Sequence, residues 1–443
     1  MFFVAGQGSS APAPQQKRLT AYLDWLALAV GHADRREPLR QYCTGLLLDG
    51  ERKSIEPMAA RLAPGEVQRM HESLHHFVAK SGWSDEAVLR QVRSHVLAAM
   101  QKRGAVTAWI VDETGFVKWG RHSVGVARQY CGRVGKRENC QVAVSLSVCT
   151  ESGSLPIAWR LYLPESWTGD EERRQAAGIP TQVAFQTKPQ IALAQIQQAA
   201  EEDVPRGVVL ADSVYGSDRE FREGVAQLQM RYAVGVKSTT TVWGLKRRPL
   251  PPAPPRGGRR AAQRLRRDRD HQPYTAEELA RALPSEDWRS VGWREGSKEQ
   301  LRSRFVAVWV RPAYGDDRKI GVQPKQWLLI EWPERSAEPI GYWLLNFPRD
   351  TKLEALVAIT KQRWMVERDY EELKQEVGLS HYEGRSWRGF HHHVTLCIAA
   401  YGFLVAERSR FSPSARVGHL GLRPARLPPH FQPRGSARSR STT

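Results

Sequence analysis

The sequence predicts an α/β protein with a mixed five-stranded sheet and flanking helices, an N-terminal all-α domain and a strand-rich insertion. Apolar runs at 106–111, 141–149 and 155–163 are joined by short connections, which favours an antiparallel meander. Strands then alternate with helices up to residue 237, a pattern typical of parallel strands covered by helices. Before the sheet, apolar residues between 19 and 100 recur at helical spacing.

Three helices are expected in the N-terminal domain, at 19–30, 66–81 and 85–101. Ser84 directly precedes the third, and serine is a common helix cap because its side-chain oxygen accepts a backbone N–H. The apolar residues of this third helix recur at helical spacing: Val88, Leu89, Val92, Val96, Leu97 and Met100.

The second half of the sheet alternates helices and strands. A helix is expected at 189–202, with Pro189 in its first turn, and a strand at 207–211. A helix at 218–229 and a strand at 231–237 complete the order β-β-β-α-β-α-β.

The region behind this core differs in composition. Residues 244–273 are rich in Pro, Gly and Arg, which indicates an extended basic linker. Strands are expected again at 304–310, 326–332 and 341–346. The linker and these strands together would form the insertion.

Two helices are expected to complete the fold, a long one at 352–377 and another at 391–407. Residues 409–443 contain no acidic residue and many Arg, Ser and Pro, which favours disorder. The predicted division has six parts: a disordered tail (1–18), an N-terminal helical DNA-binding domain (19–103), the first part of the core (104–243), the basic linker and strand-rich insertion (244–348), the helical completion of the core (349–408) and a basic disordered tail (409–443).

The net charge of +19 and the isoelectric point near 10.0 favour a nucleic acid as partner over an anionic membrane surface. No apolar run approaches the roughly 20 residues of a membrane-spanning helix, so no membrane partner is expected. The five cysteines are scattered and form no Cys-x-x-Cys pair, which favours reduced thiols over a zinc finger or disulfide framework. We therefore expect a cytoplasmic protein.

Three acidic residues stand where a site that cuts phosphodiesters would need them. Asp112 and Asp212 each follow directly after an apolar run that is typical of a buried strand. Glu367 lies on the helix predicted at 352–377. A buried carboxylate is costly unless a cation compensates its charge, and Mg²⁺ prefers oxygen ligands. A pair of such ions promotes in-line displacement at phosphorus.

Two cations share the helix face of Glu367. At 100° per residue, Arg363 lies at about −40° and Lys374 at about −20° from Glu367. An apolar stripe beside this face would pack on the sheet, so the carboxylate lies at the border of the core. The alternative is a solvated ladder of surface ion pairs.

With this spacing, Arg363-(3)-Glu367-(6)-Lys374, and the two strand-end aspartates, the sequence resembles a bacterial insertion-sequence transposase of the DDE type, whose catalytic core is RNase H-like. One branch of these enzymes carries Tyr-(2)-Arg-(3)-Glu-(6)-Lys, and here Thr360 stands at the Tyr position. Other stretches between 20 and 408 resemble the same group: 52–57, 74–77, 112–115, 212–216 and 381–387.

The resemblance implies Mg²⁺-dependent cleavage of DNA at the element ends, followed by strand transfer into target DNA. Asp112, Asp212 and Glu367 would hold two Mg²⁺ ions, for which Mn²⁺ could substitute. The implied partners are double-stranded DNA, as terminal inverted repeats and target, and a second copy of the chain in a synaptic dimer. The nucleoid would then be the place of action. A metal-dependent nuclease without strand transfer and a catalytically silent DNA-binding protein remain as alternatives.

The same resemblance assigns DNA contacts. Arg363 and Lys374 would bind backbone phosphates near the cut. Trp243 would stack on a flipped base, with Lys237 nearby at the start of the insertion; packing of Trp243 within the insertion is the alternative.

Two further features are expected to be structural. Glu113 follows Asp112 in a strand and points to the other side of the sheet. Residues 391–393 are three successive histidines, whose side chains diverge by about 100° each on a helix and cannot meet at one ion.

Overall fold

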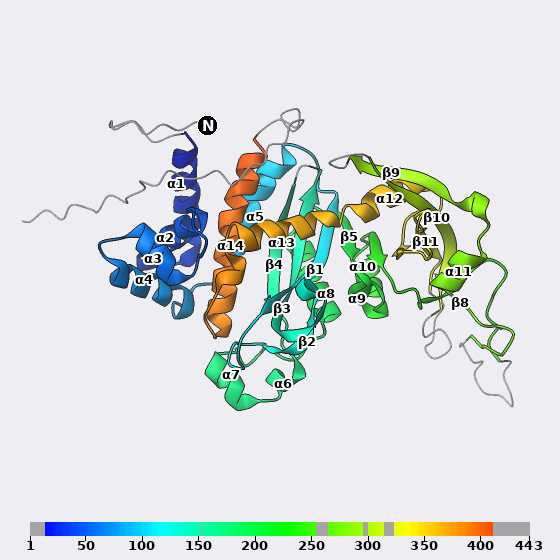
Figure 1. Ribbon diagram of the computed structural model, residues 1–443, viewed down its shortest axis with the longest axis horizontal. Coiled ribbons are helices and arrows are strands. Elements are labelled where there is room, and N and C mark those ends of the chain that lie inside the picture. The colour runs from blue at the N-terminus through cyan, green and yellow to red at the C-terminus, as the bar shows by residue number, and fades with distance from the viewer. Residues whose placement is uncertain (1–13, 152, 254–264, 296–299, 314–322, 411–443) are drawn as a thin grey trace, which may run out of the picture.

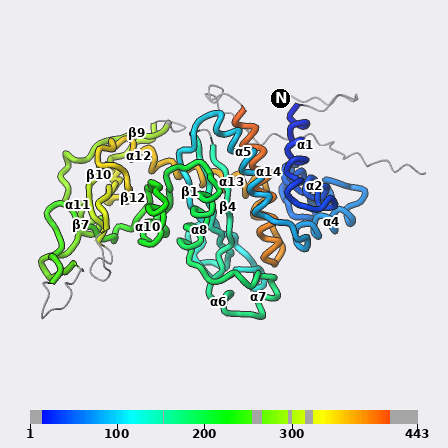
Figure 2. Tube along the Cα trace, turned by 180° about the vertical axis from the view of Figure 1, so that it is seen from behind, coloured from blue at the N-terminus to red at the C-terminus, as the bar shows by residue number. Residues whose placement is uncertain are grey.

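The computed structural model describes residues 14–151, 153–253, 265–295, 300–313 and 323–410. The predicted tails lie outside the described residues up to residue 13 and from residue 411 onward, as do residues 254–264 of the predicted linker. A group of helices, a sheet flanked by helices and a strand-rich region follow one another along the long axis (Figure 1), and the view from behind shows the same order (Figure 2).

The N-terminal region contains more helices than the sequence predicted. The helix α5 begins after Ser84, whose hydroxyl accepts a hydrogen bond from the backbone N–H of Ala87, as expected. It packs on the C-terminal part of the fold, against α14 (Trp387–Arg408) and β4 (Gly153–Leu161). The five helices are α1 (Pro14–Leu26), α2 (Arg36–Leu47), α3 (Ile55–Leu62), α4 (Val67–Ala79) and α5 (Asp85–Gln101).

The central sheet follows the predicted order of elements. Strands β1 (Ala108–Val117), β3 (Lys136–Thr150) and β4 form an antiparallel meander. Strands β5 (Val208–Ala211) and β6 (Tyr232–Gly235) run parallel to β1. Their spatial order is β4-β3-β1-β5-β6. The elements between these strands are β2 (Ala127–Cys131), α6 (Glu165–Thr168), α7 (Glu171–Ala177), α8 (Lys188–Glu201), α9 (Ser213–Gly216) and α10 (Arg219–Gln227).

The sheet contains more than the five predicted strands, so the predicted number of strands was wrong. Twelve described strands form one sheet, because β12 (Gly341–Leu345) pairs antiparallel with β6. An unpaired edge at β6 would expose backbone donors and acceptors, and the insertion covers it. The strands beyond β12 are β11 (Gln326–Glu331), β10 (Gln300–Pro312), β9 (Arg289–Glu295), β8 (Tyr274–Thr275) and β7 (Thr241–Trp243), and α11 (Ala276–Ala282) lies beside them.

The long helix predicted at 352–377 is broken into α12 (Leu353–Lys361) and α13 (Trp364–Gln375). At the break, the N–H of Met365 donates to the Gln362 carbonyl three residues back, in a tighter turn than an α-helix. The two halves pack on different surfaces: α12 on β9 and β10, and α13 on β1 and β4. The break contains neither Pro nor Gly, which is why helical periodicity did not reveal it.

Helix α14 is the central buried helix and extends the predicted 391–407 at its N-terminus. Among the described residues it alone is long and apolar enough to span a membrane by length and composition. Its apolar stretch is entirely buried within the protein, which is typical of a core helix.

Candidate functional site

Asp112 and Asp212 lie side by side on neighbouring parallel strands. Ile110 of β1 pairs with Leu210 of β5, and each aspartate lies two residues beyond this last pair. Asp212 is close enough to raise the pKa of Asp112. In parallel strands, residues in register point to the same face, and neighbouring strands are about 4.8 Å apart. Asp112 is in mid-strand, since β1 continues to Val117, whereas Asp212 directly follows β5.

A close approach of two glycines fixes the turn after Asp212. The carboxylate Oδ1 of Asp212 accepts a hydrogen bond of 2.8 Å from the backbone N–H of Val214, which caps α9. A Cβ atom at Gly216 would lie 1.9 Å from the carbonyl oxygen of Gly235 in β6. Only glycine at 216 therefore allows the turn to lie this close to the sheet.

Helix α13 packs on β1 and β4 and reaches β3 through Tyr370. The Arg363 guanidinium, just before α13, donates to Asp112 Oδ2 at 2.9 Å. The hydroxyls of Tyr370 and Ser145 are 2.7 Å apart, and Ser145 is the cross-strand neighbour of Asp112. Glu367, between Arg363 and Tyr370 on the helix, is thereby placed near the first aspartate.

One guanidinium contacts two of the three candidate acids. Arg363 Nη2 donates to Glu367 Oε1 at 3.1 Å while Nη1 holds Asp112. Burial lowers the pKa of Arg363, but Asp112, Glu367 and Asp212 outweigh burial and raise it. Burial raises the pKa of Asp112 to about 6, against the opposing effect of Arg363. Asp112 and Glu367 thus share a cation that the protein itself supplies, and Asp212 is close enough to affect the pKa of that cation.

The donor set fits hard divalent cations. All three candidates offer carboxylate oxygens, and within the described residues Asp212 Oδ2 and Glu367 Oε2 have no hydrogen-bond partner. The buried hydroxyl of Tyr215, near both aspartates, is also without a partner there. As they stand, no three His, Cys, Asp or Glu side chains of the described chain are arranged to hold a metal ion. Arg363 lies between Asp112 and Glu367.

Lys374 and Thr360 are both engaged within the protein. Lys374 Nζ donates to Thr114 Oγ1 and, at 3.3 Å, to the Gly115 carbonyl in β1. Burial lowers the pKa of Lys374 to about 8. The hydroxyl of Thr360 donates to the Leu356 carbonyl at 2.7 Å, so it is directed into its own helix.

The two candidates at the start of the insertion differ in exposure. Trp243 in β7 is only 4% exposed, and the Arg267 guanidinium lies 5.6 Å from its ring centroid. In this structure the ring therefore packs within the protein, as the alternative expects. Stacking on a base would require the ring to move. Lys237 is exposed and lines a cleft of about 690 Å³ together with Thr187 and Arg219.

The features expected to be structural are engaged in internal contacts. Glu113 forms an ion pair of 2.7 Å with Lys188 of α8, away from Asp112. The three histidines of α14 are buried and contact separate groups: His391 the Leu161 N–H, His392 the Val78 and Trp83 carbonyls, and His393 the Tyr42 hydroxyl and Gly378 carbonyl.

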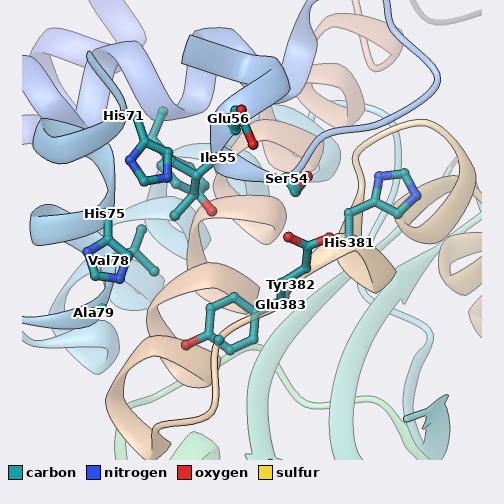
Figure 3. A pocket seen from close by; sticks show the side chains of 12 residues that line it. Ser54, Ile55, Glu56, His71, His75, Val78, Ala79, His381, Tyr382 and Glu383 are labelled. Atoms are coloured by element: carbon teal, nitrogen blue, oxygen red, sulfur yellow. The ribbon is translucent and has the colours of Figure 1, made fainter. Parts of the chain in front are cut away.

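A cavity of about 240 Å³ between the N-terminal helices and the segment before α14 also contains histidines. Figure 3 shows His71 and His75 of α4 on one side of it and His381 on the other. The rings of His71 and His75 are stacked, 6.1 Å apart. Because the histidines stand on opposite walls, this cavity does not form a metal centre.

Sequence reasoning missed Lys53, which connects the N-terminal helices to α13. Its buried ammonium group donates to the carbonyls of Leu46 and Glu376, at the C-terminal ends of α2 and α13. Its backbone N–H donates to His381 Nδ1 at 3.0 Å. The stretch 52–57 was singled out by resemblance, but a lysine among charged residues carries no signal of burial.

A comparison with protein families finds one that covers most of the chain. The family model described as DDE superfamily endonuclease matches residues 26–300, more than half of the chain. The chain therefore belongs to this family. The matched range includes Asp112 and Asp212, whereas Glu367 lies beyond it.

The chain is also similar to a transposase. It is 30% identical over 227 residues to the probable transposase for insertion sequence element IS701 of Microchaete diplosiphon. The similarity covers 51% of this chain and 55% of that protein, so the chain spans about half the length of its relative.

Proposed function

We propose that this protein is a transposase that cleaves DNA at the ends of an insertion sequence and transfers the strands into target DNA. The observation that carries the proposal is that Asp112 in β1 and Asp212, directly after the neighbouring parallel strand β5, each lie two residues beyond the last pair of these strands, with Glu367 joined to Asp112 through Arg363. The family match and the similarity to a transposase support it.

Asp112, Asp212 and Glu367 would hold two Mg²⁺ ions, with Mn²⁺ as a substitute. Such ions supply the Lewis acidity that activates the attacking group and stabilises the leaving oxygen at phosphorus. Arg363, released from the carboxylates, would donate to the phosphate being cut. Lys374, held on β1 by Thr114, would neutralise a neighbouring phosphate.

The partners follow from this chemistry. The substrate would be double-stranded DNA, first as the terminal inverted repeats and then as target, and two copies of the chain would bring two ends together. The net charge of +19 favours such a polyanion. A protein with this substrate would act in the bacterial cytoplasm, at the nucleoid.

Neutralising any one of the acids tests the proposal. We expect Asp112→Asn, Asp212→Asn and Glu367→Gln each to reduce Mg²⁺-dependent cleavage of DNA carrying the element ends by at least about 100-fold. DNA binding measured in EDTA should change little, because the acids themselves do not attract phosphate. Cleavage is read on denaturing gels and binding by fluorescence anisotropy.

Glu371→Gln is the matched control, since it neutralises an exposed carboxylate one turn further along α13. It should cleave like the unmodified protein. Full cleavage by any of the three acid variants would contradict the proposal. A pre-cut end separates the alternatives: joining to target DNA indicates a transposase, whereas cleavage without joining indicates a nuclease.

A further inference from the structure

The segment from the last residue of β1 to the first two residues of β3 forms a strongly basic arm, residues 117–137. It contains six Lys or Arg residues and no Asp or Glu. Among the described residues, no ion pair holds Arg121, Arg128 or Arg133, and all three are exposed. These charges are not used to hold the fold together.

The same arm exposes an unusual number of apolar side chains. Nine large hydrophobic residues of the described chain are exposed, and four belong to the arm. Trp119 is 97% exposed, Tyr130 is 55% exposed, and Val117 and Val134 are the other two. Aromatic rings among cations are typical of surfaces that bind nucleic acid by stacking and charge.

The exposure of Trp119 does not come from a loose backbone. The N–H of Lys118 donates to the Asn139 carbonyl at 3.0 Å. The Asn139 side-chain amide donates in return to the carbonyls of Lys118 and Gly120, at 2.6 and 2.9 Å. The backbone on both sides of Trp119 is therefore fixed to β3, and the ring is held out to solvent.

The arm continues β1 beyond the candidate catalytic acids: Val117 lies five strand residues, about 17 Å, from Asp112. Lys374 of α13 contacts Thr114 and Gly115, which lie between Asp112 and the arm on β1. Burial is the main cause that lowers the pKa of Lys374, and Arg133, in the turn of the arm, is close enough to lower it further. Arg363, Lys374 and Arg133 thus form a row of cations from the acids to the arm.

A groove of about 660 Å³ runs beside Trp119. Lys118 and Trp119 form one wall, while Arg52 and Arg385, from the N-terminal helices and from the segment before α14, line the other parts. The groove also contains Glu51 and Glu383, and Glu383 forms an ion pair with Arg52. Among the described residues, the lining cations outside any ion pair are Lys118 and Arg385, and a flat ring beside them matches a base and its phosphates.

We propose that the basic arm binds the DNA strand that leads away from the acids, with Trp119 stacked on an unpaired base and Arg121, Arg128 and Arg133 against the backbone. This inference rests on the proposed function, because it takes DNA as the substrate of the neighbouring acids. It adds a binding surface and a preference: a base face is open only where strands are unpaired, so DNA with a single-stranded overhang binds more tightly than a blunt duplex.

Binding of the full-length protein to labelled DNA in EDTA tests this without cleavage. Blunt duplexes and duplexes with an overhang are compared over a range of salt concentrations by fluorescence anisotropy. We expect Trp119→Ala to weaken binding to the overhang DNA by about 5- to 100-fold and to remove the preference over blunt duplex. Trp119→Phe should keep part of that preference, because a smaller ring still stacks.

The arginines are tested by the salt dependence of binding. Arg121→Ser and Arg133→Ser should each reduce the slope of log affinity against log salt by about one unit. Arg206→Ser is the matched control, since Arg206 is exposed at the opposite end of β5 from Asp212, and it should leave the slope unchanged. Unchanged thermal unfolding would establish that the variants are folded.

Wild-type affinity, preference and salt slope in the Trp119→Ala and Arg133→Ser proteins would overturn the arm as a DNA-binding surface. An equal loss on blunt and overhang DNA would overturn the stacking of Trp119. Either result, together with Mg²⁺-dependent cleavage by the unmodified protein, leaves the proposed function standing. A protein that neither binds nor cleaves element-end DNA would instead contradict both.

Discussion

Arg363 holds charges that would otherwise be unpaired at the border of the core. Asp112 is nearly buried, and the guanidinium is the largest influence that keeps its pKa from rising further. The same guanidinium holds the more exposed Glu367. If cations bind these acids, they compete with Arg363, which then becomes free to contact phosphate.

We therefore predict that Arg363→Gln lowers the free energy of unfolding by about 1–3 kcal/mol in EDTA, because a buried carboxylate loses its counter-charge. Mg²⁺ should restore more stability to this variant than to the unmodified protein, since a ligand that binds the folded state stabilises it. Urea unfolding with and without Mg²⁺ measures both effects. Arg349→Gln, at an exposed arginine, is the control, and equal stability of the two variants in EDTA would refute the prediction.

The sequence predicted the placement of some side chains and not of others. The shared face of Arg363, Glu367 and Lys374 followed from helix geometry, because a helix repeats every 3.6 residues whatever it packs on. The exposure of Trp119 and the burial of Lys53 depend on which distant segments cover them. From residue type alone, a tryptophan is expected to be mostly buried and a lysine to be exposed.

At the scale of elements, strands and helices were predicted where the hydrophobic period matched one surface. The alternation α8-β5-α10-β6 falls close to the predicted ranges, and the meander β1-β3-β4 has the predicted order. The first two strands of the meander are longer than predicted, so Asp112 lies within β1 and not at its end. The break between α12 and α13 was missed, because the chain there leaves one packing surface for another without a change of helix propensity. The pairing of β12 with β6 was missed because strand partners far apart in sequence leave no local pattern.

The C-terminal end of α13 depends on a glycine. Gly378 has a φ of +81°, and a Cβ atom there would lie 2.6 Å from the Cβ of Lys53. We predict that Gly378→Ala lowers the free energy of unfolding by about 1–3 kcal/mol, through backbone strain and the clash with the lysine that caps α13. Denaturant unfolding provides the measurement.

Gly82→Ala is the matched control. No atom lies within 4 Å of a Cβ at Gly82, and its φ is not in the left-handed region. Its unfolding free energy should stay within about 0.5 kcal/mol of the unmodified protein. A similar change in both glycine variants would show that the contact between Gly378 and Lys53 has no special role.

At the scale of the whole molecule, α14 joins the N-terminal helices to the sheet. It contacts α2, α4 and α5 on one side and β4 on the other. Buried histidines mediate part of this junction: the Tyr42 hydroxyl in α2 donates to His393 Nδ1 at 2.9 Å, and His393 Nε2–H donates to the Gly378 carbonyl at 3.2 Å. Both contacts suit a neutral ring.

The junction should therefore weaken in acid. Burial lowers the pKa of His393 to about 4. The Gly378 carbonyl raises this pKa, whereas Lys118 and His381 lower it, and these effects are smaller than that of burial. Between the ordinary histidine pKa of about 6.5 and this value, the unfolded chain binds the proton more readily than the folded one. The stability that His393 contributes is present above about pH 6.5 and is lost as the pH falls through this window, by up to about 1.4 kcal/mol per pH unit.

We predict that His393→Gln, which keeps a donor and an acceptor but does not titrate, loses less stability than the unmodified protein when the pH falls from about 7 to about 5. The difference should be about 1–2 kcal/mol by urea unfolding, because the other buried histidines titrate equally in both proteins. His32→Gln, at an exposed ring, should keep the full pH dependence. If His393→Gln and the unmodified protein lost the same stability, the neutral imidazole would not be what holds α2 against α14.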